Sequence, residues 1–314
     1  MKHLYRTLSQ PIYDVPHIFL LLLFETALTS LVVSHIPYTE IDWVAYMQEV
    51  SAYQNGERDY VNIRGDTGPL VYPAGFLYLY SWLKTLASNA AAAGRASMES
   101  GDDFLELDGS TSPIAIRKIQ WVFVVLYLVN SVVVTALYQR VLSGMRQKQR
   151  QRDEQNCSFS ALVWTWRFAM GITCLSKRIH SIFVLRLFND APAMLLLYLS
   201  MYLFACCDAW ALGCVVFSLA VSIKMNVLLF APGLLLLLLQ RNGSLLGTIR
   251  HLAICAVVQI VLGWPFLSTY PVSYIKKAFE FDRVGVGVTF VPFGYIGLVG
   301  EEMVECIHGS AKTG

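Results

Sequence analysis

One acidic stretch of the sequence is placed to do general-base chemistry. Glu40 and Asp42 follow an apolar run that ends at Pro37, so Asp42 lies where a membrane span would meet water. A carboxylate at such a boundary can accept a proton from an attacking hydroxyl group. The same spacing also fits a helix over residues 42–53, with Asp42 as its N-cap and Glu40 as a solvated neighbour. Spacing alone favours the helix start.

A second polar segment, residues 64–75 (RGDTGPLVYPAG), contains three glycines and two prolines. Glycine and proline at this density predict a rigid, shaped turn. The turn carries Arg64 and Asp66, and it leads into aromatic residues that are typical of a membrane–water interface. By itself, Asp66 reads most simply as an ordinary turn or cap residue.

Basic residues gather in a third segment, residues 176–192. Lys177, Arg178 and His180 are close enough in sequence to bind one anion, such as a phosphate, through charge-assisted hydrogen bonds. Nonspecific binding of lipid headgroups is the alternative for the same three residues.

The same segment also contains a helix-start pattern. Asn189 and Asp190 precede Pro192, and this order predicts that a helix begins there. Asp190 could cap that helix or form an ion pair with Arg186, four residues earlier.

The composition indicates which elements position these residues. Hydrophobic residues make up 55% of the 314 residues and charged residues 15%, and the mean hydropathy is +0.51. A soluble domain carries about 25% charged residues, so the composition argues against a soluble enzyme, a disordered chain and a secreted disulfide scaffold. The net charge of +2 does not indicate a nucleic-acid partner. The seven cysteines lie mostly in apolar runs without metal-ligand spacing, so we interpret them as small buried side chains.

Seven apolar stretches are long enough, or nearly so, to cross a bilayer, which takes about 20 residues. They are residues 18–36, 119–142, 161–175, 191–207, 209–223, 227–239 and 251–267. The first contains Glu25, which we expect to face the interior of the helix bundle. Residues 71–87 are apolar and aromatic but include Pro73 and Lys84, so we expect them to lie at the membrane interface.

The basic residues predict the orientation of the spans. Residues 140–157 carry five Lys or Arg against two acids, which places this loop in the cytosol by the positive-inside rule. The basic N-terminus also suggests a cytosolic start, so two spans separate the two segments. Residues 35–116 then form one long loop on the opposite, luminal side, with eleven acids and four bases.

The later loops reach the same luminal side by alternation, at residues 176–190, 224–226 and 268–283. Acids then come from the first loop and bases from the later ones, which suits a carboxylate base opposite an anion clamp. Two glycosylation sequons, at Asn156 and Asn242, fall on predicted cytosolic loops, so we expect neither to be glycosylated.

Four stretches of the sequence resemble one enzyme family. They are EIDWVAYMQEV (40–50), GDTGPLVYPAG (65–75), SKRIHSIFVLRLFNDAP (176–192) and SIKMNVLLFAPG (222–233). Together they resemble the dolichyl-phosphate-mannose-dependent alpha-1,3-mannosyltransferases of the endoplasmic reticulum (ER) N-glycan pathway, the asparagine-linked glycosylation protein 3 family. The resemblance covers about residues 37–283, apart from inserts at 88–112 and 140–158.

This resemblance implies an all-α, polytopic membrane protein with a GT-C glycosyltransferase fold, about seven spans and interfacial helices in the first luminal loop. It implies a multi-pass ER membrane enzyme that transfers mannose from dolichyl-phosphate mannose to the five-mannose dolichyl-diphosphate oligosaccharide. The donor is beta-linked and the product alpha-1,3, so the anomeric centre is inverted. The implied partners are these two substrates and ER membrane lipid. Neither nucleic acid nor a cofactor is expected, because the lipid-linked donor is itself a substrate.

Under the resemblance, Asp42 becomes the expected catalytic base. The departing lipid phosphate is weakly basic, so it needs charge stabilisation and no general acid. The residues expected to stabilise it are Arg178 and Arg186, with Lys177 and His180 beside them. Asp66 would hold sugar hydroxyls or position its loop, and a metal held by Asp42 and Asp66 stays an alternative, although none is demanded. The other expected substrate-binding residues are Glu40, Arg64, Asn189 and Asp190.

The resemblance also divides the chain. Residues 1–283 would form the GT-C-like transmembrane domain, and residues 284–314 a divergent C-terminal tail. The tail is rich in glycine and lacks an apolar run of span length, so we expect the chain to be truncated relative to the family. The alternative functions are another dolichyl-phosphate-sugar-dependent GT-C transferase, an inactive truncated form, and a lipid or solute transporter.

Overall fold

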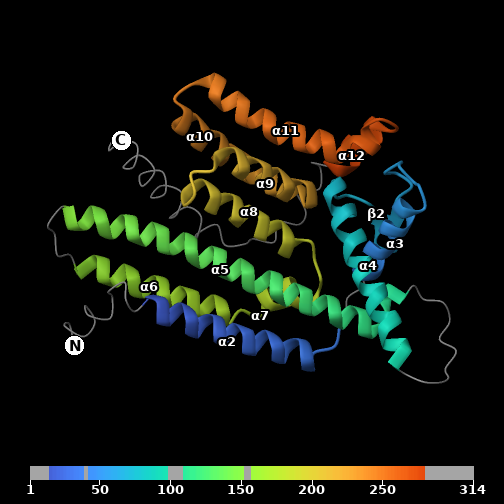
Figure 1. The fold of residues 1–314 in the computed structure, drawn as a ribbon, viewed down its shortest axis with the longest axis horizontal. Coiled ribbons are helices and arrows are strands. Elements are labelled where there is room, and N and C mark those ends of the chain that lie inside the picture. Colours follow the sequence, from blue (N-terminus) through green and yellow to red (C-terminus); the bar gives the residue numbers. More distant parts are fainter. Residues whose placement is uncertain (1–13, 39–41, 98–108, 152–156, 280–314) are drawn as a thin grey trace.

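The computed structural model describes residues 14–38, 42–97, 109–151 and 157–279 (Figure 1). Within these ranges the only strands are the two short ones of a single hairpin, and the elements around them are helices. The expected all-α fold is therefore confirmed. Glu40 and the tail at 284–314 lie outside the described residues.

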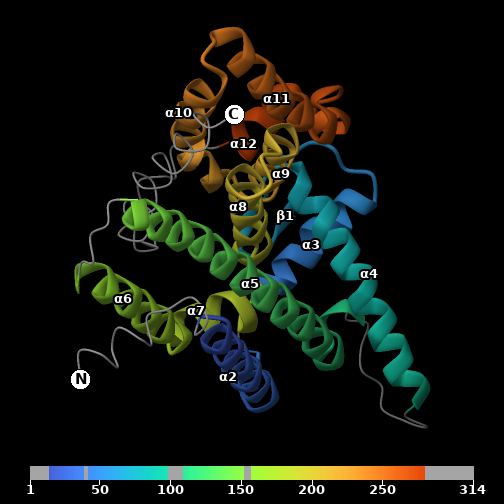
Figure 2. The ribbon, with the colours of Figure 1, turned by 60° about the vertical axis from the view of Figure 1, so that its left-hand side comes forward.

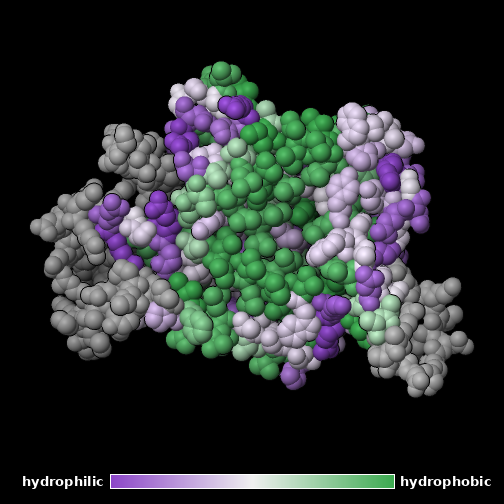
Figure 3. All heavy atoms as spheres, in the orientation of Figure 1, coloured by the Kyte–Doolittle hydropathy of each residue, from purple (hydrophilic) through white to green (hydrophobic). Residues whose placement is uncertain are grey.

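Two long apolar helices form one side of the molecule. α2 (Asp14–His35) and α5 (Pro113–Gln151) lie side by side in both ribbon views (Figure 2). Large apolar side chains remain exposed along both helices, with Phe19 66% and Val125 59% exposed. Figure 3 shows a broad hydrophobic band across the middle of this face, with hydrophilic residues gathered toward its two ends. A band of this kind is what a bilayer requires of a helical protein.

The remaining apolar stretches also form helices. They are α6 (Cys157–Cys174), α8 (Asp190–Ala205), α9 (Trp210–Ile223), η4 (Met225–Phe230), α10 (Ala231–Asn242) and α11 (Leu245–Leu267). Four segments of the described chain are long and apolar enough to cross a membrane, or five if one bent pair forms a single span. α8 and α9 are shorter apolar helices. The sequence predicted seven stretches, and this number of spans stays a prediction.

The described loops between the spans lie at two ends of the bundle (Figure 1). At one end, the Arg241 guanidinium pairs with the carboxylate of Asp208 at 2.7 Å. At the other end, the Lys224 ammonium pairs with the carboxylate of Asp190 at 2.6 Å. The loops with Asp208 and Arg241 therefore lie at one end and those with Asp190 and Lys224 at the other. The positive-inside rule places these two sets of loops on opposite sides of the membrane. Which end faces the lumen stays a prediction.

A layer of elements outside the apolar spans covers the end that contains Asp190. Its members are α3 (Asp42–Gln54), β1 (Arg64–Gly65), β2 (Gly68–Pro69), α4 (Ala74–Ser97), η2 (Gly109–Thr111) and α12 (Pro271–Ala278). The predicted helix over 42–53 and the turn over 64–75 are confirmed. α4, expected at the interface, is not among the described helices that are apolar enough to span. Trp43, Tyr60, Phe76 and Tyr80 are fully buried in the core of this layer.

Two glycines let the hairpin pack closely on α3. A Cβ atom at Gly65 would lie 2.5 Å from the carbonyl oxygen of Ala45, so only glycine fits there. Gly68 has a φ of +128°, a conformation that side chains disfavour. The paired residues are Gly65 with Gly68 and Arg64 with Pro69, which places the turn at Asp66 and Thr67.

The third apolar stretch is broken. α6 ends at Cys174, and α7 (Lys177–His180) and η3 (Ser181–Leu185) continue at an angle of 51° to it. Ser176 caps α7, because its hydroxyl oxygen accepts a hydrogen bond from the amide of Ile179 at 3.4 Å. Residues 176–190, expected to be a loop, are therefore largely helical.

Candidate active site

Asp42 lies in the first turn of α3 and is half-buried. Two contacts fix this end of the helix. The Trp43 amide donates a hydrogen bond to the Tyr38 hydroxyl at 3.1 Å, and the Trp43 indole donates to the carbonyl of Ser110 at 3.0 Å. Because Trp43 is fully buried, the adjacent carboxylate is held in a defined place at the edge of the aromatic core.

Three tyrosines, Tyr46, Tyr72 and Tyr80, form a cluster next to Asp42. The hydroxyl groups of Tyr46 and Tyr72 are 3.4 Å apart, and the rings of Tyr46 and Tyr80 meet edge to face at 5.0 Å. Phe76 stacks on Tyr80 at 4.4 Å, and its ring is tilted against that of Tyr72 at 4.7 Å. The tyrosine cluster therefore joins α3, the segment after the hairpin, and α4.

Burial and nearby carboxylates from distant parts of the chain raise the pKa values of this cluster. Burial raises the pKa of Tyr72, its hydrogen bond with Tyr46 offsets part of the rise, and the charges of Glu49, Asp190 and Asp42 add to it. Burial, then the charges of Tyr72, Asp190, Tyr38 and Asp42, raise the pKa of Tyr80 in the same direction. Both tyrosines therefore stay protonated at neutral pH and can donate hydrogen bonds. Asp42 and Asp190 are close enough to influence the same phenols.

The start of α8 is fixed at this end of the bundle by three contacts. The Tyr80 hydroxyl donates to the carbonyl of Leu187 at 2.8 Å, and the Asn189 side chain donates to the carbonyl of Ile223 at 3.5 Å. Asp190 pairs with Lys224 at 2.6 Å. The helix start predicted at Asn189 and Asp190 is confirmed, but the Asn189 side chain makes no cap hydrogen bond. Asp190 forms an ion pair with Lys224, and the pairing with Arg186 that sequence spacing suggested stays a prediction.

The hairpin residues are placed differently from Asp42. Asp66 is exposed, and its carboxylate and amide form a reciprocal pair of hydrogen bonds with the Gln48 side chain at 2.8 and 2.7 Å. Arg64 is also exposed and donates to the carbonyl of Val61 at 3.0 Å. These contacts fix the hairpin on α3. Among the described residues, no group of three or more His, Cys, Asp or Glu side chains is arranged to hold a metal ion.

The basic segment is divided between two depths of the bundle. Lys177 and Arg178 are exposed on α7. Their neighbour His180 pairs with Glu25, which lies ten residues before His35, or about 15 Å from that end of α2. Arg186 lies nearer the tyrosine cluster, since the next residue, Leu187, accepts the bond from Tyr80.

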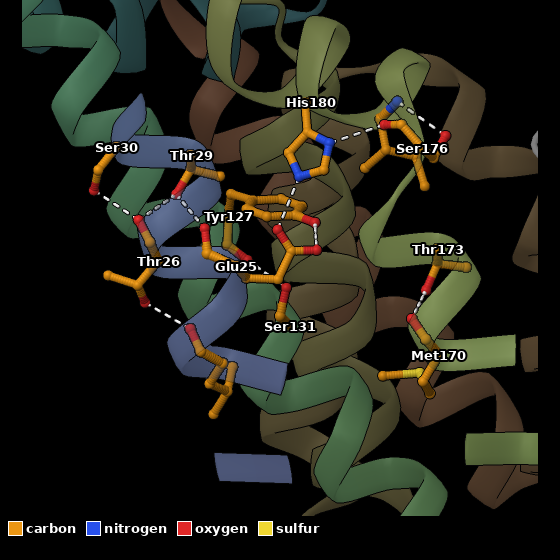
Figure 4. Close-up of polar contacts among 12 residues, drawn as sticks. Glu25, Thr26, Thr29, Ser30, Tyr127, Ser131, Met170, Thr173, Ser176 and His180 are labelled. Carbon is orange, nitrogen blue, oxygen red and sulfur yellow. Dashed lines mark hydrogen bonds and ion pairs between the residues drawn. The ribbon is translucent and has the colours of Figure 1, made fainter. Parts of the chain in front are cut away.

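His180 itself is buried. Figure 4 shows it between Ser176 and Glu25, with the Tyr127 ring alongside. Its Nε2 atom is 2.8 Å from Glu25 Oε2, and its Nδ1 atom is 2.9 Å from the carbonyl oxygen of Ser176. The Tyr127 hydroxyl donates to Glu25 Oε1 at 2.8 Å. Both ring nitrogens of His180 are thus occupied, which leaves neither for the anion binding expected from the sequence.

The structure therefore gathers only part of the predicted site. The charges of Asp42 and Asp190 both raise the pKa values of Tyr72 and Tyr80, whereas Lys177 and Arg178 lie at the start of α7, after the break that follows α6. Sequence reasoning gave no role to the tyrosine cluster. The spacing of Phe76 and Tyr80, four residues apart in what became α4, was the available signal for part of it, and Tyr72 lies before that helix.

Comparison with known proteins places the chain in a family. The model of the family described as ALG3 protein matches residues 19–99 and 104–286. A relative from Arabidopsis thaliana, named Dol-P-Man:Man(5)GlcNAc(2)-PP-Dol alpha-1,3-mannosyltransferase, is 44% identical over 296 residues, covering 93% of this chain and 57% of the relative. Relatives of the same name from Mus musculus and Homo sapiens are each 42% identical over 89% and 88% of this chain, and over 53% of their own length.

The chain spans about half the length of these curated relatives. No solved structure matches the chain. The family match covers most of the sequence, and it includes both the Asp42 helix and the broken segment that carries Lys177 and Arg178. The chain belongs to the ALG3 protein family.

Proposed function

We propose that this protein is a mannosyltransferase of the ER membrane. It transfers mannose from dolichyl-phosphate mannose, in alpha-1,3 linkage, to the dolichyl-diphosphate-linked five-mannose oligosaccharide. The observation that carries the proposal is the 44% identity, over 93% of the chain, to a relative that is named for this reaction. The half-buried carboxylate of Asp42, whose charge raises the pKa values of Tyr46, Tyr72 and Tyr80, supports it.

In the proposed reaction, Asp42 acts as the general base. A mannose hydroxyl of the acceptor attacks the anomeric carbon of the donor mannose, and the bond from that carbon to the phosphate oxygen breaks. The hydroxyl proton passes to the Asp42 carboxylate, and dolichyl phosphate leaves with the bonding electron pair. A single displacement inverts the anomeric centre, which converts the beta-linked donor into an alpha-linked product.

Charge stabilisation of the leaving phosphate is assigned to basic side chains. Arg186 directly precedes Leu187, whose carbonyl accepts the hydrogen bond from Tyr80, and its guanidinium lies 5.6 Å from the ring centre of Phe188. Lys177 and Arg178 would contact the lipid phosphate from the break before α7. Because cationic side chains do this work, the proposal calls for no metal and no cofactor besides the lipid-linked donor.

The protonated tyrosines and neighbouring polar groups are assigned to substrate hydroxyls. Tyr72 keeps its proton because it is buried among negative charges, so it can donate a hydrogen bond to a sugar oxygen. Asn189 and Asp190 border the same region, and Asp66 and Arg64 hold the hairpin at its edge. Glu40 precedes Asp42 in sequence and completes the proposed set.

The test is transfer by the purified 314-residue chain in nanodiscs, with defined dolichol-linked donor and acceptor. We expect an alpha-1,3-linked product, and we expect D42N to lower kcat at least a hundredfold, the scale of a lost general base. E57Q, which changes another carboxyl of the same loop, is the matched control and should transfer at close to the unsubstituted rate. Activity retained in D42N would remove Asp42 as the base. A different linkage would identify another GT-C reaction, and absence of transfer would contradict the proposal.

A further inference from the structure

The Glu25 contacts join three elements inside the bundle. Glu25 comes from α2, Tyr127 from α5, and His180 from α7, and the three residues are 2%, 6% and 5% exposed. Glu25 and His180 are 155 positions apart in sequence. A carboxylate in the middle of a membrane span is costly unless it is paired, so this residue needs both of its partners. Nothing in the proposed reaction uses Glu25 directly.

The hydrogen-bond partners of His180 and Glu25 determine where the protons of this pair lie. The Ser176 carbonyl can only accept, so Nδ1 of His180 carries a proton and donates to it at 2.9 Å. A second proton must then lie between Nε2 and Glu25 Oε2, since these atoms are 2.8 Å apart. The Tyr127 hydroxyl supplies the donor for the other carboxylate oxygen. Every polar atom of the two side chains is thus satisfied.

The Glu25–His180 pair contributes to the position of α7. This helix has four residues, which is too short for a helix to be stable by itself. It follows a turn at Leu175 and continues into a π-helical segment, so neither neighbour extends it as a regular α-helix. The contacts that fix it are the Ser176 cap, the packing of Ile179 against the buried cluster of Val33, Val124, Tyr127 and Val184, and the contact of His180 with Glu25. The exposed residues Lys177 and Arg178 lie on the same single turn.

The two bases at this break call for an anion. Lys177 and Arg178 make no ion pair within the described part of the chain, and both side chains are exposed. Broken helices inside membrane proteins occur where the backbone lines a binding site, and uncompensated charges at that depth mark function. The proposed donor carries a phosphate next to a hydrocarbon chain, which matches two exposed cations that follow the exposed apolar side chains of Ile172 and Leu175.

We propose that Glu25, acting through His180, is a positioning residue that holds Lys177 and Arg178 where they bind the phosphate of the lipid-linked donor. The proposal rests on the proposed function, because the donor is its ligand. Glu25 touches no substrate; it sets the place of the turn that does. Loss of the pair should therefore weaken donor binding and leave the chemical step at Asp42 nearly unchanged.

The first experiment compares E25L with T29V in nanodiscs. Thr29 lies one turn along α2, is fully buried, and its hydroxyl bonds only to backbone carbonyls of its own helix. E25L should raise KM for dolichyl-phosphate mannose about tenfold with kcat within about twofold, which corresponds to about 1.4 kcal/mol of donor binding. E25Q keeps a hydrogen-bonding amide and should show a smaller rise. T29V should leave both constants unchanged.

A second variant separates positioning from stability. Removing both members of a buried pair can restore stability, because no uncompensated charge is left. The E25L/H180L double variant should therefore recover the melting temperature lost in E25L while its donor KM stays high. If the melting temperature and the donor KM of the double variant both return to the values of the unsubstituted chain, the pair is merely structural and the proposal is overturned.

A third comparison tests whether Glu25 acts through the two bases. Binding of dolichyl phosphate to nanodiscs should weaken in E25L and in K177Q/R178Q, and adding E25L to K177Q/R178Q should change little more. Independent, additive losses would overturn the proposal.

Phosphatidylserine in the nanodisc should not reduce the binding of dolichyl phosphate to the unsubstituted chain. A reduction would assign the two bases to ordinary lipid headgroups and overturn the proposal. An unsubstituted chain that neither binds nor transfers would overturn the proposed function itself, whereas normal transfer with unchanged KM in E25L would overturn this inference alone.

Discussion

The hydroxyl group of Tyr80 donates a hydrogen bond to the backbone carbonyl of Leu187 at 2.8 Å, across 107 positions of sequence. This contact ties α4, which belongs to the layer outside the apolar spans, to the segment that enters α8 within the bundle. Leu187 adopts a φ of +57°, which is unfavourable for a residue with a side chain. The contact thus helps to hold the turn that places Asn189 and Asp190 near Asp42.

Replacement of Tyr80 tests this link. Y80F removes the donor and leaves the buried carbonyl of Leu187 without it, so we expect a loss of about 1–2 kcal/mol of stability. The proposed transfer activity should fall as well, because Asp190 loses its fixed position relative to Asp42. Thermal unfolding and kcat/KM measure the two effects. Y270F changes an exposed tyrosine and is the control; equal effects in both variants would contradict the assignment.

Glu49 makes stability depend on pH. It is 4% exposed, and its Oε2 atom has no hydrogen-bond partner among the described residues. Burial raises the pKa of Glu49 to about 8 from an ordinary 4.5. Below pH 4.5 the folded and unfolded states are both protonated. Between pH 4.5 and 8 the unfolded state releases the proton first, so folding becomes less favourable as pH rises, by about 1.4 kcal/mol per unit at most.

E49Q should abolish this dependence. The variant cannot ionise at position 49, so its stability relative to the unsubstituted chain should increase from pH 4.5 to 8 and then level off. Melting temperatures of both proteins across this range measure the difference. A difference that stays constant with pH would show that Glu49 is not the buried acid that titrates. D66N, at an exposed carboxyl, should follow the unsubstituted protein.

The ion pair between Asp190 and Lys224 should show measurable coupling. Their side chains are 33% and 19% exposed, so solvent screens part of the attraction. In a double-mutant cycle with D190N and K224M, we expect a coupling energy of about 0.5–1 kcal/mol in thermal unfolding. The cycle with D208N and R241M, at the opposite and more exposed pair, should give a smaller value. Strictly additive losses in both cycles would contradict a stabilising role for the Asp190 pair.

Glycosylation can test the orientation of the spans. Asn55 and Gly56 lie in an exposed turn of the predicted luminal loop, and E57T completes a sequon there. In ER membranes we expect E57T to gain one glycan, seen as a mobility shift that endoglycosidase removes. The natural sequons at Asn156 and Asn242 should stay unmodified, since they belong to the predicted cytosolic loops. A glycan on either of them would reverse the orientation.

Local features of the sequence determined most of the elements. Runs of apolar residues predicted where helices form, and Pro73 with three nearby glycines predicted the turn before α4, because hydropathy and backbone restrictions act over short distances. The interior position of Glu25 was also predictable, since a lone carboxylate in an apolar run cannot face lipid without great cost. The family resemblance, carried by four contiguous stretches, agrees with the match to residues 19–99 and 104–286.

Only the tertiary structure decided which side chains meet. Sequence spacing offered a phosphate as the partner of His180, whereas the fold supplies Glu25, and it gave no sign that Lys224 would pair with Asp190. Both partners lie far away in sequence, so no local pattern could reveal them. Pairing of buried charges depends on how helices pack, because burial makes each charge require the nearest opposite group that the bundle brings to it. The sequence thus defined the helices and the polar residues, and helix packing decided which of those residues share a site.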